Sequence, residues 1–326
     1  MTDVVVLGSV NMDLVAQVAR LPNPGETLMG SDFVTVPGGK GANQAVAAAR
    51  LGAKTAMVGR VGEDGFGEVL RDRLQSENID TTMLSTSRTA PSGTALIALA
   101  LDNNQIIVVS GANGEVSDSD LDRLTPYFER AKVLLLQLEI PLATVKKAAA
   151  LAVSAGLIVI VDPAPVPADE DVLTQDFCGH VSILTPNQTE AAQLTGIEVV
   201  DMEGAIAAAE ALQQKGIETV IVKMGELGCV CATKNGTFSL PAFSVTVADT
   251  VAAGDAFNGG LAAALCRTDL SRAEVSRYLS SHDFLKSAIE YASAVAALAI
   301  THSGAQNAMP LAADVEAFLQ KQQFVV

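Results

Sequence analysis

Several residue types that mark particular protein classes are scarce or absent in this chain. It has no tryptophan, 4% aromatic residues, three histidines and four cysteines. Basic residues are outnumbered, 21 against 37 acidic ones, which gives a net charge of −16. A surface this acidic repels phosphate backbones and anionic lipids. We therefore expect neither nucleic acid nor a membrane as a partner.

The cysteines and the apolar runs argue against two further classes. None of the cysteines forms a CxxC pair or a zinc-type spacing with a histidine, so we expect buried, reduced thiols at Cys178, Cys229, Cys231 and Cys266. The N-terminal segment has no basic region, and the apolar run at 291–300 is shorter than the ~20 residues that cross a bilayer. We expect a cytoplasmic protein.

What the chain does contain is an alternation of short apolar runs with segments of helical periodicity. The runs, rich in Val, Ile and Leu, occupy residues 4–7, 55–59, 133–138, 157–162, 181–184 and 219–224. Repeated strand–helix–strand order requires right-handed crossovers and a sheet covered by helices on both sides. We predict an α/β fold with a mostly parallel sheet.

Two stretches interrupt this order. Residues 12–36 and 93–111 show strand-like alternation with turn signals and no helix between neighbouring strands. We predict that these two insertions form a small antiparallel sheet standing off the main domain. Because one of its faces would be apolar, the sheet should cover either a ligand or another subunit.

Two polar motifs lie near the N-terminus, where a strand ends at Gly8. Asn11 and Asp13 lie two residues apart, so they can bind a polyol together or form a capped turn. The glycine pair before Lys40 precedes a helix expected to begin near Ala42, and it lacks the spacing of a phosphate-binding P-loop. This segment binds sugar hydroxyls or anion oxygens, or it is a tight turn with a surface lysine.

Two further motifs follow later strands. In TPNQTE, Asn187 and Glu190 can form a helix cap, or Glu190 can bind hydrated Mg²⁺. The glycines of KMGELG, at 223–228, allow a nucleotide to approach the backbone, although a hairpin turn also fits.

The stretch DTVAAGDAFNGG, which starts at Asp249, combines two acids with small residues. A helix beginning near Ala252 or Ala253 would leave the N–H groups of 252–255 unpaired and aimed outward as an anion site. The helix dipole should lower the pKa of Asp255, so that its carboxylate stays ionised and takes a proton from an attacking hydroxyl. The alternative is that Asp255 only stabilises its own helix.

Together these motifs resemble the ribokinase-like (PfkB) family of carbohydrate kinases. The resemblance rests on GGKGANQAVAAARLGA and DTVAAGDAFNGG, with GSVNMD, QLE at 137–139, TPNQTE and SGAQ at 303–306 in the family's order. It spans essentially the whole chain. It implies a single kinase domain over 1–326 with a Rossmann-like three-layer αβα fold and a small β-sheet lid formed by about 12–36 and 93–111.

The resemblance also implies a reaction. ATP would phosphorylate D-ribose at its 5-hydroxyl, with deoxyribose, fructose or a nucleoside such as adenosine as alternative acceptors. Mg²⁺ would accompany ATP, K⁺ would activate the enzyme, and pairing of two lids would make a homodimer. Ala256, where the family often has Thr, and the long segment 266–295 depart from the usual pattern.

The resemblance assigns residues to each part of such a site. Asp255 would be the general base, and the anion hole would be formed by Ala252, Ala253 and Gly254. The sugar would be bound, together with Asp255, by Asn11, Met12, Asp13, Gly39, Lys40, Gly41, Ala42, Asn43 and Glu139. ATP would be bound by Asn187, Lys223, Met224, Gly225, Glu226, Leu227, Gly228, Gly254, Asp255 and Ser293. Glu190 would position Mg²⁺. K⁺ would be bound by Asp249, by the carbonyl of Val251 and by backbone groups near Ala299, His302 and Gly304.

Two other function classes fit the sequence less well. A sugar-binding protein without catalytic activity would be indicated by loss of Asp255 or of the small residues before it, and both are present. A nicotinamide-dependent enzyme would need the glycine fingerprint after the first strand, which does not follow Gly8.

Overall fold

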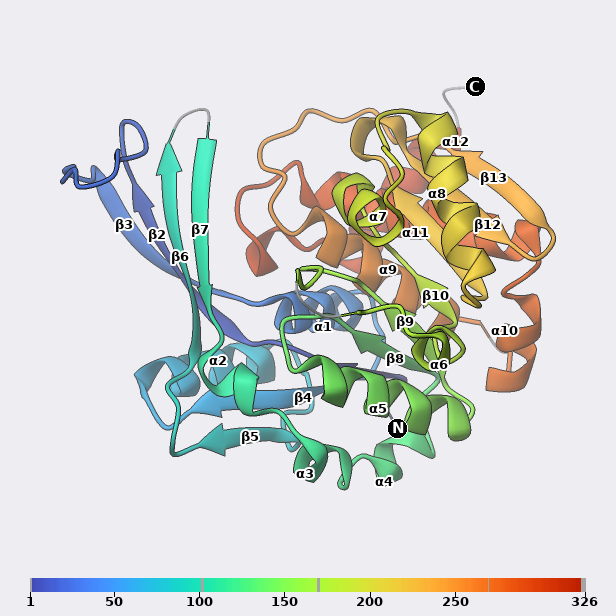
Figure 1. The fold of residues 1–326 in the computed structure, drawn as a ribbon, viewed down its shortest axis with the longest axis horizontal. Coiled ribbons are helices and arrows are strands. Elements are labelled where there is room, and N and C mark those ends of the chain that lie inside the picture. Colours follow the sequence, from blue (N-terminus) through green and yellow to red (C-terminus); the bar gives the residue numbers. More distant parts are fainter. Residues whose placement is uncertain (1, 101–102, 169–170, 269, 324–326) are drawn as a thin grey trace.

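A nine-stranded sheet forms the centre of the molecule in the computed structural model, which describes residues 2–100, 103–168, 171–268 and 270–323 (Figure 1). In spatial order its strands are β13 (Gly236–Leu240), β12 (Cys229–Thr233), β11 (Thr219–Lys223), β10 (Ile183–Leu184), β9 (Ile158–Val161), β8 (Val133–Leu136), β1 (Val4–Leu7), β4 (Thr55–Gly62) and β5 (Leu84–Ser87). The strands from β11 to β5 pair in parallel, whereas β12 and β13 add antiparallel at one edge. The predicted α/β fold with a mostly parallel sheet is confirmed.

Helices cover both faces of this sheet and make three layers. One face is covered by α1 (Lys40–Arg50), α2 (Gly65–Ser76), α9 (Ala253–Cys266), α10 (Arg272–Tyr278), α11 (His282–Ala299) and α12 (Ala312–Gln323). The other is covered by α3 (Asp118–Leu121), α4 (Thr125–Phe128), α5 (Leu142–Ser154), α6 (Gln175–Cys178), α7 (Gln188–Thr195) and α8 (Met202–Gln214). Strand residues alternate between the two cores: Val4 and Val6 face one, Val5 and Leu7 the other. This two-sided burial explains the continuous apolar runs.

Small residues let α1 and α9 approach each other closely. A side-chain carbon on Gly259 would lie 2.4 Å from Ala47 Cβ and 2.7 Å from the carbonyl oxygen of Gln44. Likewise, a side-chain carbon on Gly41 would lie 2.8 Å from the backbone of Gly8. These contacts bring the N-terminal turns of both helices to the end of β1.

A second sheet of four strands stands off the main body (Figure 1). Its order is β3 (Asp32–Gly38), β2 (Asn11–Gln17), β6 (Gly93–Ala100) and β7 (Asn103–Val109). The prediction of an antiparallel sheet is wrong for its central pair, because β2 and β6 pair in parallel. Each predicted segment is antiparallel within itself, but the first strands of both leave the main body in the same direction. Residues 101 and 102 lie outside the described residues.

Other differences from the predicted elements are local. Helix α1 begins at Lys40 rather than near Ala42, and the strand expected over 133–138 ends at Leu136. Three of the cysteines are buried free thiols as expected, whereas Cys266 is only partly buried. In the part of the chain that the structure describes, no helix is long and apolar enough to cross a membrane.

Candidate active site

Asp255 lies where the N-terminal turns of α1 and α9 meet. Its carboxylate accepts hydrogen bonds from Asn43 Nδ2 at 2.9 Å and from Gln44 Nε2 at 3.1 Å. The residue is 5% exposed. The sequence predicted Asn43 and Asp255 as site residues, and the fold brings them into contact. Gln44 was missed, because a glutamine within a helix carries no signal by itself.

The pKa of Asp255 contradicts the prediction from the helix dipole. Burial raises the pKa of this carboxyl to about 6, although Lys40 lowers it, and Asp162 raises it further. The helix terminus does not compensate for the loss of water around the carboxylate. Asp255 is therefore a carboxylate close to the basicity that proton transfer near neutral pH requires.

Two more carboxylates, Asp13 and Glu139, surround the same space. Glu139 Oε2 accepts from Ser9 Oγ at 2.5 Å and from the Lys40 N–H at 3.3 Å. Burial, together with the charges of Glu139 and Asp255, raises the pKa of Asp13 to about 7. Several acceptors thus gather around one small space, a pattern that suits a ligand rich in hydroxyl groups.

Lys40 balances this negative charge. Burial works to lower the pKa of its ammonium, but neighbouring carboxylates, chiefly Asp255 and Asp162, outweigh burial and raise that pKa. Lys40 therefore stays protonated in the site. The backbone of Asn11 packs against Gly39, the residue before Lys40, since a side-chain carbon on Gly39 would lie 2.7 Å from the Asn11 backbone nitrogen.

The predicted sugar residues fall into three groups: polar residues, core residues and glycines. Asn11, Asp13, Lys40, Asn43, Glu139 and Asp255 bring polar groups together, and the buried Asn43 Oδ1 has no partner within the described residues. Met12 and Ala42 instead belong to the hydrophobic core. Gly41 packs against Gly8, and Gly39 has a φ of 89°, which favours glycine.

A cleft of about 910 Å³ opens from Asp255 toward α7 and α11. The residues predicted to bind ATP that line this cleft are Asn187, Lys223, Gly225, Glu226, Gly228, Gly254, Asp255 and Ser293. Met224 is buried in the core and Leu227 is not part of the lining. The segment 242–247, which the sequence analysis did not single out, contributes several residues to the wall.

An ion pair lies on the floor of this cleft. Lys223 Nζ is 3.1 Å from Asp162 Oδ1, and both side chains are largely buried. Gln44 Nε2 donates to Asp162 Oδ2 at 3.0 Å as well as to Asp255. Asp162 directly follows β9, so its place after a buried strand was the only sequence signal for it. The pair is therefore linked to Asp255 through one amide.

The turn before α9 exposes backbone donors toward Lys223. Ala252 has a φ of 58°, which is rare outside glycine. The predicted row of free N–H groups is interrupted at Ala253, whose N–H donates to the Thr250 carbonyl at 3.3 Å. The N–H groups of Ala252, Gly254 and Asp255 have no acceptor among the described residues. A side-chain carbon on Gly254 would lie 3.3 Å from Lys223 Nζ, so this turn and the ammonium form one anion-binding corner.

The residues predicted to bind metal ions are spread over several elements. Glu190 and Asn187 form a capping box at α7, which is the helix cap that the sequence analysis gave as the alternative to Mg²⁺ binding. Glu190 also lines the cleft. Asp249 accepts from the N–H groups of Val251 and Gly304, each at 3.0 Å. No cluster of three acidic, His or Cys residues that would bind a metal occurs in the described part of the chain.

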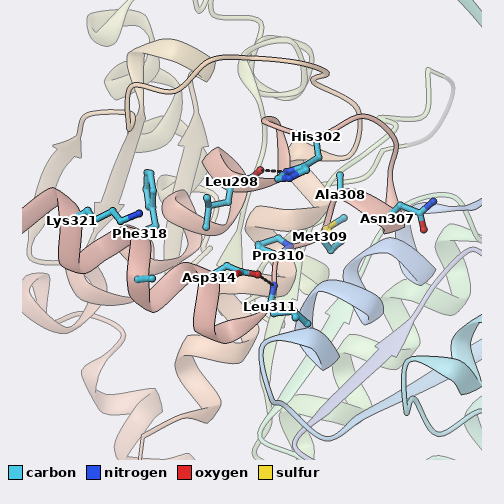
Figure 2. A pocket seen from close by; sticks show the side chains of 11 residues that line it. Leu298, His302, Asn307, Ala308, Met309, Pro310, Leu311, Asp314, Phe318 and Lys321 are labelled. Carbon is cyan, nitrogen blue, oxygen red and sulfur yellow. Dashed lines mark hydrogen bonds between the residues drawn. The ribbon is translucent and has the colours of Figure 1, made fainter.

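Two other residues predicted to lie near K⁺ are Ala299, at the end of α11, and His302, just after this helix. Ala299 is buried. The His302 side chain lies at a separate cavity of about 460 Å³ between α11 and α12, where its Nδ1 is 3.4 Å from the Leu298 carbonyl oxygen (Figure 2). The K⁺ contact predicted here is with backbone groups near His302, so the position of this ring does not test it.

Comparison with known proteins gives consistent results. The family model described as pfkB family carbohydrate kinase matches residues 1–312. The ribokinase of Haemophilus influenzae is 39% identical over 97% of this chain and 97% of its own length, and the deoxyribokinase of Salmonella typhimurium is 35% identical over 94% and 95%. The structure of Arabidopsis thaliana ribokinase complexed with ribose and ATP superposes with a TM-score of 0.81 at 31% identity, covering 98% of this chain and 99% of the other.

Proposed function

Because this chain belongs to the pfkB family of carbohydrate kinases, we propose that it transfers the γ-phosphoryl group of ATP to the 5-hydroxyl of D-ribose, giving D-ribose 5-phosphate and ADP. One observation carries the proposal most directly. Asp255 lies between a polar cluster suited to a sugar and a cleft large enough for a nucleotide. Relatives that carry the name ribokinase supply the choice of ribose.

Asp255 is the general base in this proposal. It takes the proton from the 5-hydroxyl while that oxygen forms a bond to the γ-phosphorus and the bond from this phosphorus to the ADP oxygen breaks. Asn43 and Gln44 fix the carboxylate in position. The N–H groups of Ala252 and Gly254 stabilise the charge on the transferring phosphoryl oxygens, and that of Ala253 contributes only if it leaves Thr250.

The remaining polar groups position the two substrates. Asn11, Asp13, Lys40 and Glu139 hydrogen-bond the sugar hydroxyls, and Gly39 lets the sugar approach the backbone. Asn187, Ser293 and the 223–228 turn bind the nucleotide. Alignment of the hydroxyl with the phosphorus accounts for a large part of the rate enhancement in such reactions.

Two cations belong to the proposal. Glu190 faces the cleft and fits Mg²⁺, which proteins bind through one or two carboxylates together with the phosphates of the nucleotide. Bound Mg²⁺ supplies charge neutralisation for ATP. Asp249, the carbonyl of Val251 and backbone groups near Ala299, His302 and Gly304 would bind K⁺. The bound ion would order the turn before α9.

The four-stranded sheet has the role of a lid in this proposal, within a single kinase domain over the whole chain. Exposed apolar side chains on it, among them Phe33, Ile106 and Ile107, support pairing with a second lid in a homodimer. The four cysteines are free thiols, which supports a cytoplasmic enzyme because the cytoplasm keeps thiols reduced.

The proposal is tested with a panel of acceptors. Ribose, 2-deoxyribose, fructose and adenosine are assayed with Mg-ATP, with and without K⁺. We expect the largest kcat/KM for ribose. Higher kcat/KM for 2-deoxyribose would favour the second candidate function, a deoxyribokinase, which the 35% identical Salmonella relative raises. If the rate is the same with and without K⁺ in the assay, K⁺ has no part in the proposed function.

A further inference from the structure

Asn113 has a buried side-chain amide. All of its side-chain hydrogen bonds are to residues at the start of β2. Its Oδ1 accepts from the Val10 backbone N–H at 2.9 Å. Its Nδ2 donates to Asn11 Oδ1 at 2.7 Å and to the Val10 carbonyl at 3.2 Å. Asn113 is 1% exposed and lies in η1 (Gly111–Glu115), 102 residues after Asn11 in the chain.

These contacts fix the orientation of both amides. A backbone N–H only donates, so Asn113 must present its oxygen to Val10 and its nitrogen to Asn11. Asn11 must then present its oxygen to Asn113. Its own Nδ2 donates to no described residue and is the group left for a ligand. The buried pair thus sets Asn11 as a hydrogen-bond donor to the sugar.

The surroundings leave no room for another arrangement. A side-chain carbon on Gly93 would lie 2.2 Å from Asn113 Nδ2 and 2.3 Å from Asn11 Oδ1, so glycine is required beside the pair. Gly111 has a φ of 50°, and a side-chain carbon there would lie 2.4 Å from the Pro91 carbonyl oxygen. Close packing therefore holds η1 where Asn113 reaches β2.

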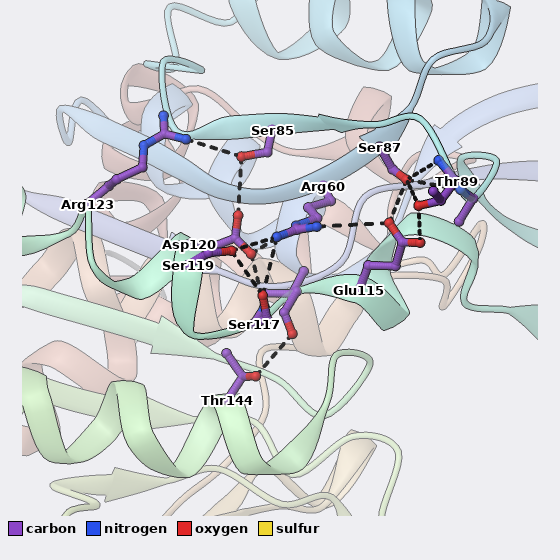
Figure 3. Close-up of polar contacts among 12 residues, drawn as sticks. Arg60, Ser85, Ser87, Thr89, Glu115, Ser117, Ser119, Asp120, Arg123 and Thr144 are labelled. Atoms are coloured by element: carbon purple, nitrogen blue, oxygen red, sulfur yellow. Dashed lines mark hydrogen bonds and ion pairs between the residues drawn. The ribbon is translucent and has the colours of Figure 1, made fainter.

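A polar network anchors the far end of η1 (Figure 3). Glu115 accepts from Ser87 Oγ at 2.5 Å and from Thr89 Oγ1 at 2.7 Å, and Arg60 lies 3.9 Å away. Arg60 also pairs with Asp120 at 2.9 Å. This network connects η1 to β4, β5 and α3 of the main body, so Asn113 is part of a rigid support rather than of a free loop.

We propose that Asn113 is a positioning residue for sugar specificity: it holds Asn11 with Nδ2 toward the substrate, so that the site favours a sugar with a hydroxyl there over its deoxy analogue. This inference rests on the proposed function, because Asn11 must contact the sugar. It matters because the relatives named ribokinase are 33–40% identical to the chain, a range that includes the 35% of the relatives named deoxyribokinase. The names of the relatives favour ribose, but percentage identity does not show which residues make that choice.

The test compares kcat/KM for ribose with kcat/KM for 2-deoxyribose in five variants. In Asn113→Ala we expect the ribose value to fall about tenfold through KM, the deoxyribose value to change less than about threefold, and KM for ATP to stay constant. Asn113→Asp keeps the shape and the acceptor for Val10 but cannot donate to Asn11, so the ribose preference should fall here too. Ser119→Ala is the control, because exposed Ser119 belongs to the Arg60 network but not to the amide pair.

A double variant separates positioning from general stability. If Asn113 acts through Asn11, then Asn11→Ala combined with Asn113→Ala has the same sugar preference as Asn11→Ala alone. Thermal unfolding identifies variants that fail to fold. If Asn113→Ala does not fold, the proposal is decided with Asn113→Asp. Its ratio of kcat/KM for ribose to kcat/KM for 2-deoxyribose and its ribose affinity by calorimetry should both be lower than those of the parent.

Two results would overturn the proposal. One is a folded Asn113→Ala protein whose sugar preference stays within twofold of the parent. The other is a double variant in which the two losses multiply. Failure of the proposed function is visible separately, because the unmodified enzyme would then not turn over ribose. If ribose is not a substrate, the same variants of Asn11 and Asn113 are assayed with the sugar that the enzyme prefers and with the deoxy analogue of that sugar.

Discussion

Replacing Asp255 by Asn should abolish turnover and at the same time stabilise the fold. The loss of activity follows from removal of the base, which in general acid–base catalysis contributes about 10²–10⁴-fold. The gain in stability follows from the raised pKa. Folded Asp255 has a pKa of about 6 against an ordinary value of 3.8. The folded state therefore binds the proton more tightly, and ionisation of Asp255 lowers the free energy of unfolding as pH rises from 3.8 to about 6.

The magnitude follows from this difference in pKa. At 1.36 kcal/mol per pKa unit, the ionised carboxylate costs about 3 kcal/mol at pH 7. The attraction of Lys40 for the carboxylate is already contained in this pKa. The substitution also removes one acceptor for Asn43 or Gln44, which costs about 1–2 kcal/mol. A net gain of about 1–2 kcal/mol remains, which raises Tm by about 1.5–3 °C in a chain of 326 residues.

Thermal unfolding at pH 7 and at pH 4.5 measures this effect. The gain in Tm should be large at pH 7 and smaller at pH 4.5, where Asp255 is mostly protonated in the folded protein. Asp249→Asn is the matched control, because both oxygens of that partly buried carboxylate accept backbone N–H groups. We expect it to lower Tm. The reasoning is refuted if Asp255→Asn lowers Tm at pH 7, or if it keeps more than about 1% of the turnover.

Three further outcomes are expected. The kcat/KM for the sugar should rise from pH 5 to about pH 8 and then level off. Asp255, whose pKa is raised to about 6, must ionise to take the proton, and Asp13, whose pKa is raised to about 7, must ionise to accept hydrogen bonds from the sugar hydroxyls. A profile that falls over this range contradicts that assignment. Lys223→Met should raise KM for ATP and lower kcat about tenfold, because the ammonium lies beside the anion-binding turn. Lys223→Arg should recover part of the activity. Unchanged KM and kcat for ATP would exclude this role of Lys223. Gly259→Ala should lower the free energy of unfolding by about 1–3 kcal/mol in a denaturant titration, because its new methyl group would overlap Ala47.

The central sheet was predictable because its signal is local. Runs such as 4–7 and 157–162 are apolar throughout since both faces of each strand are buried. The parallel pairing of β2 with β6 was not predictable in the same way. Alternation identified the strands, but pairing between two distant hairpins depends on the direction in which each leaves the main body.

The candidate site was predictable to the extent that its motifs are continuous in sequence. Asn11, Lys40, Asn43 and Asp255 were all found from short motifs, and the fold brings them together. Gln44, Asp162 and Asn113 were missed. Each is a common polar residue whose importance comes only from its partner in the fold.

The sequence by itself determined the order of strands and helices, the residue types of the site and the small residues that allow α1 and α9 to meet. These depend on neighbours within a turn or two. Only the tertiary structure decided that Asp255 has a raised rather than a lowered pKa, and which way the Asn11 amide faces. Both depend on burial and on groups 212 and 102 positions away in the chain, because desolvation and hydrogen bonding act through space.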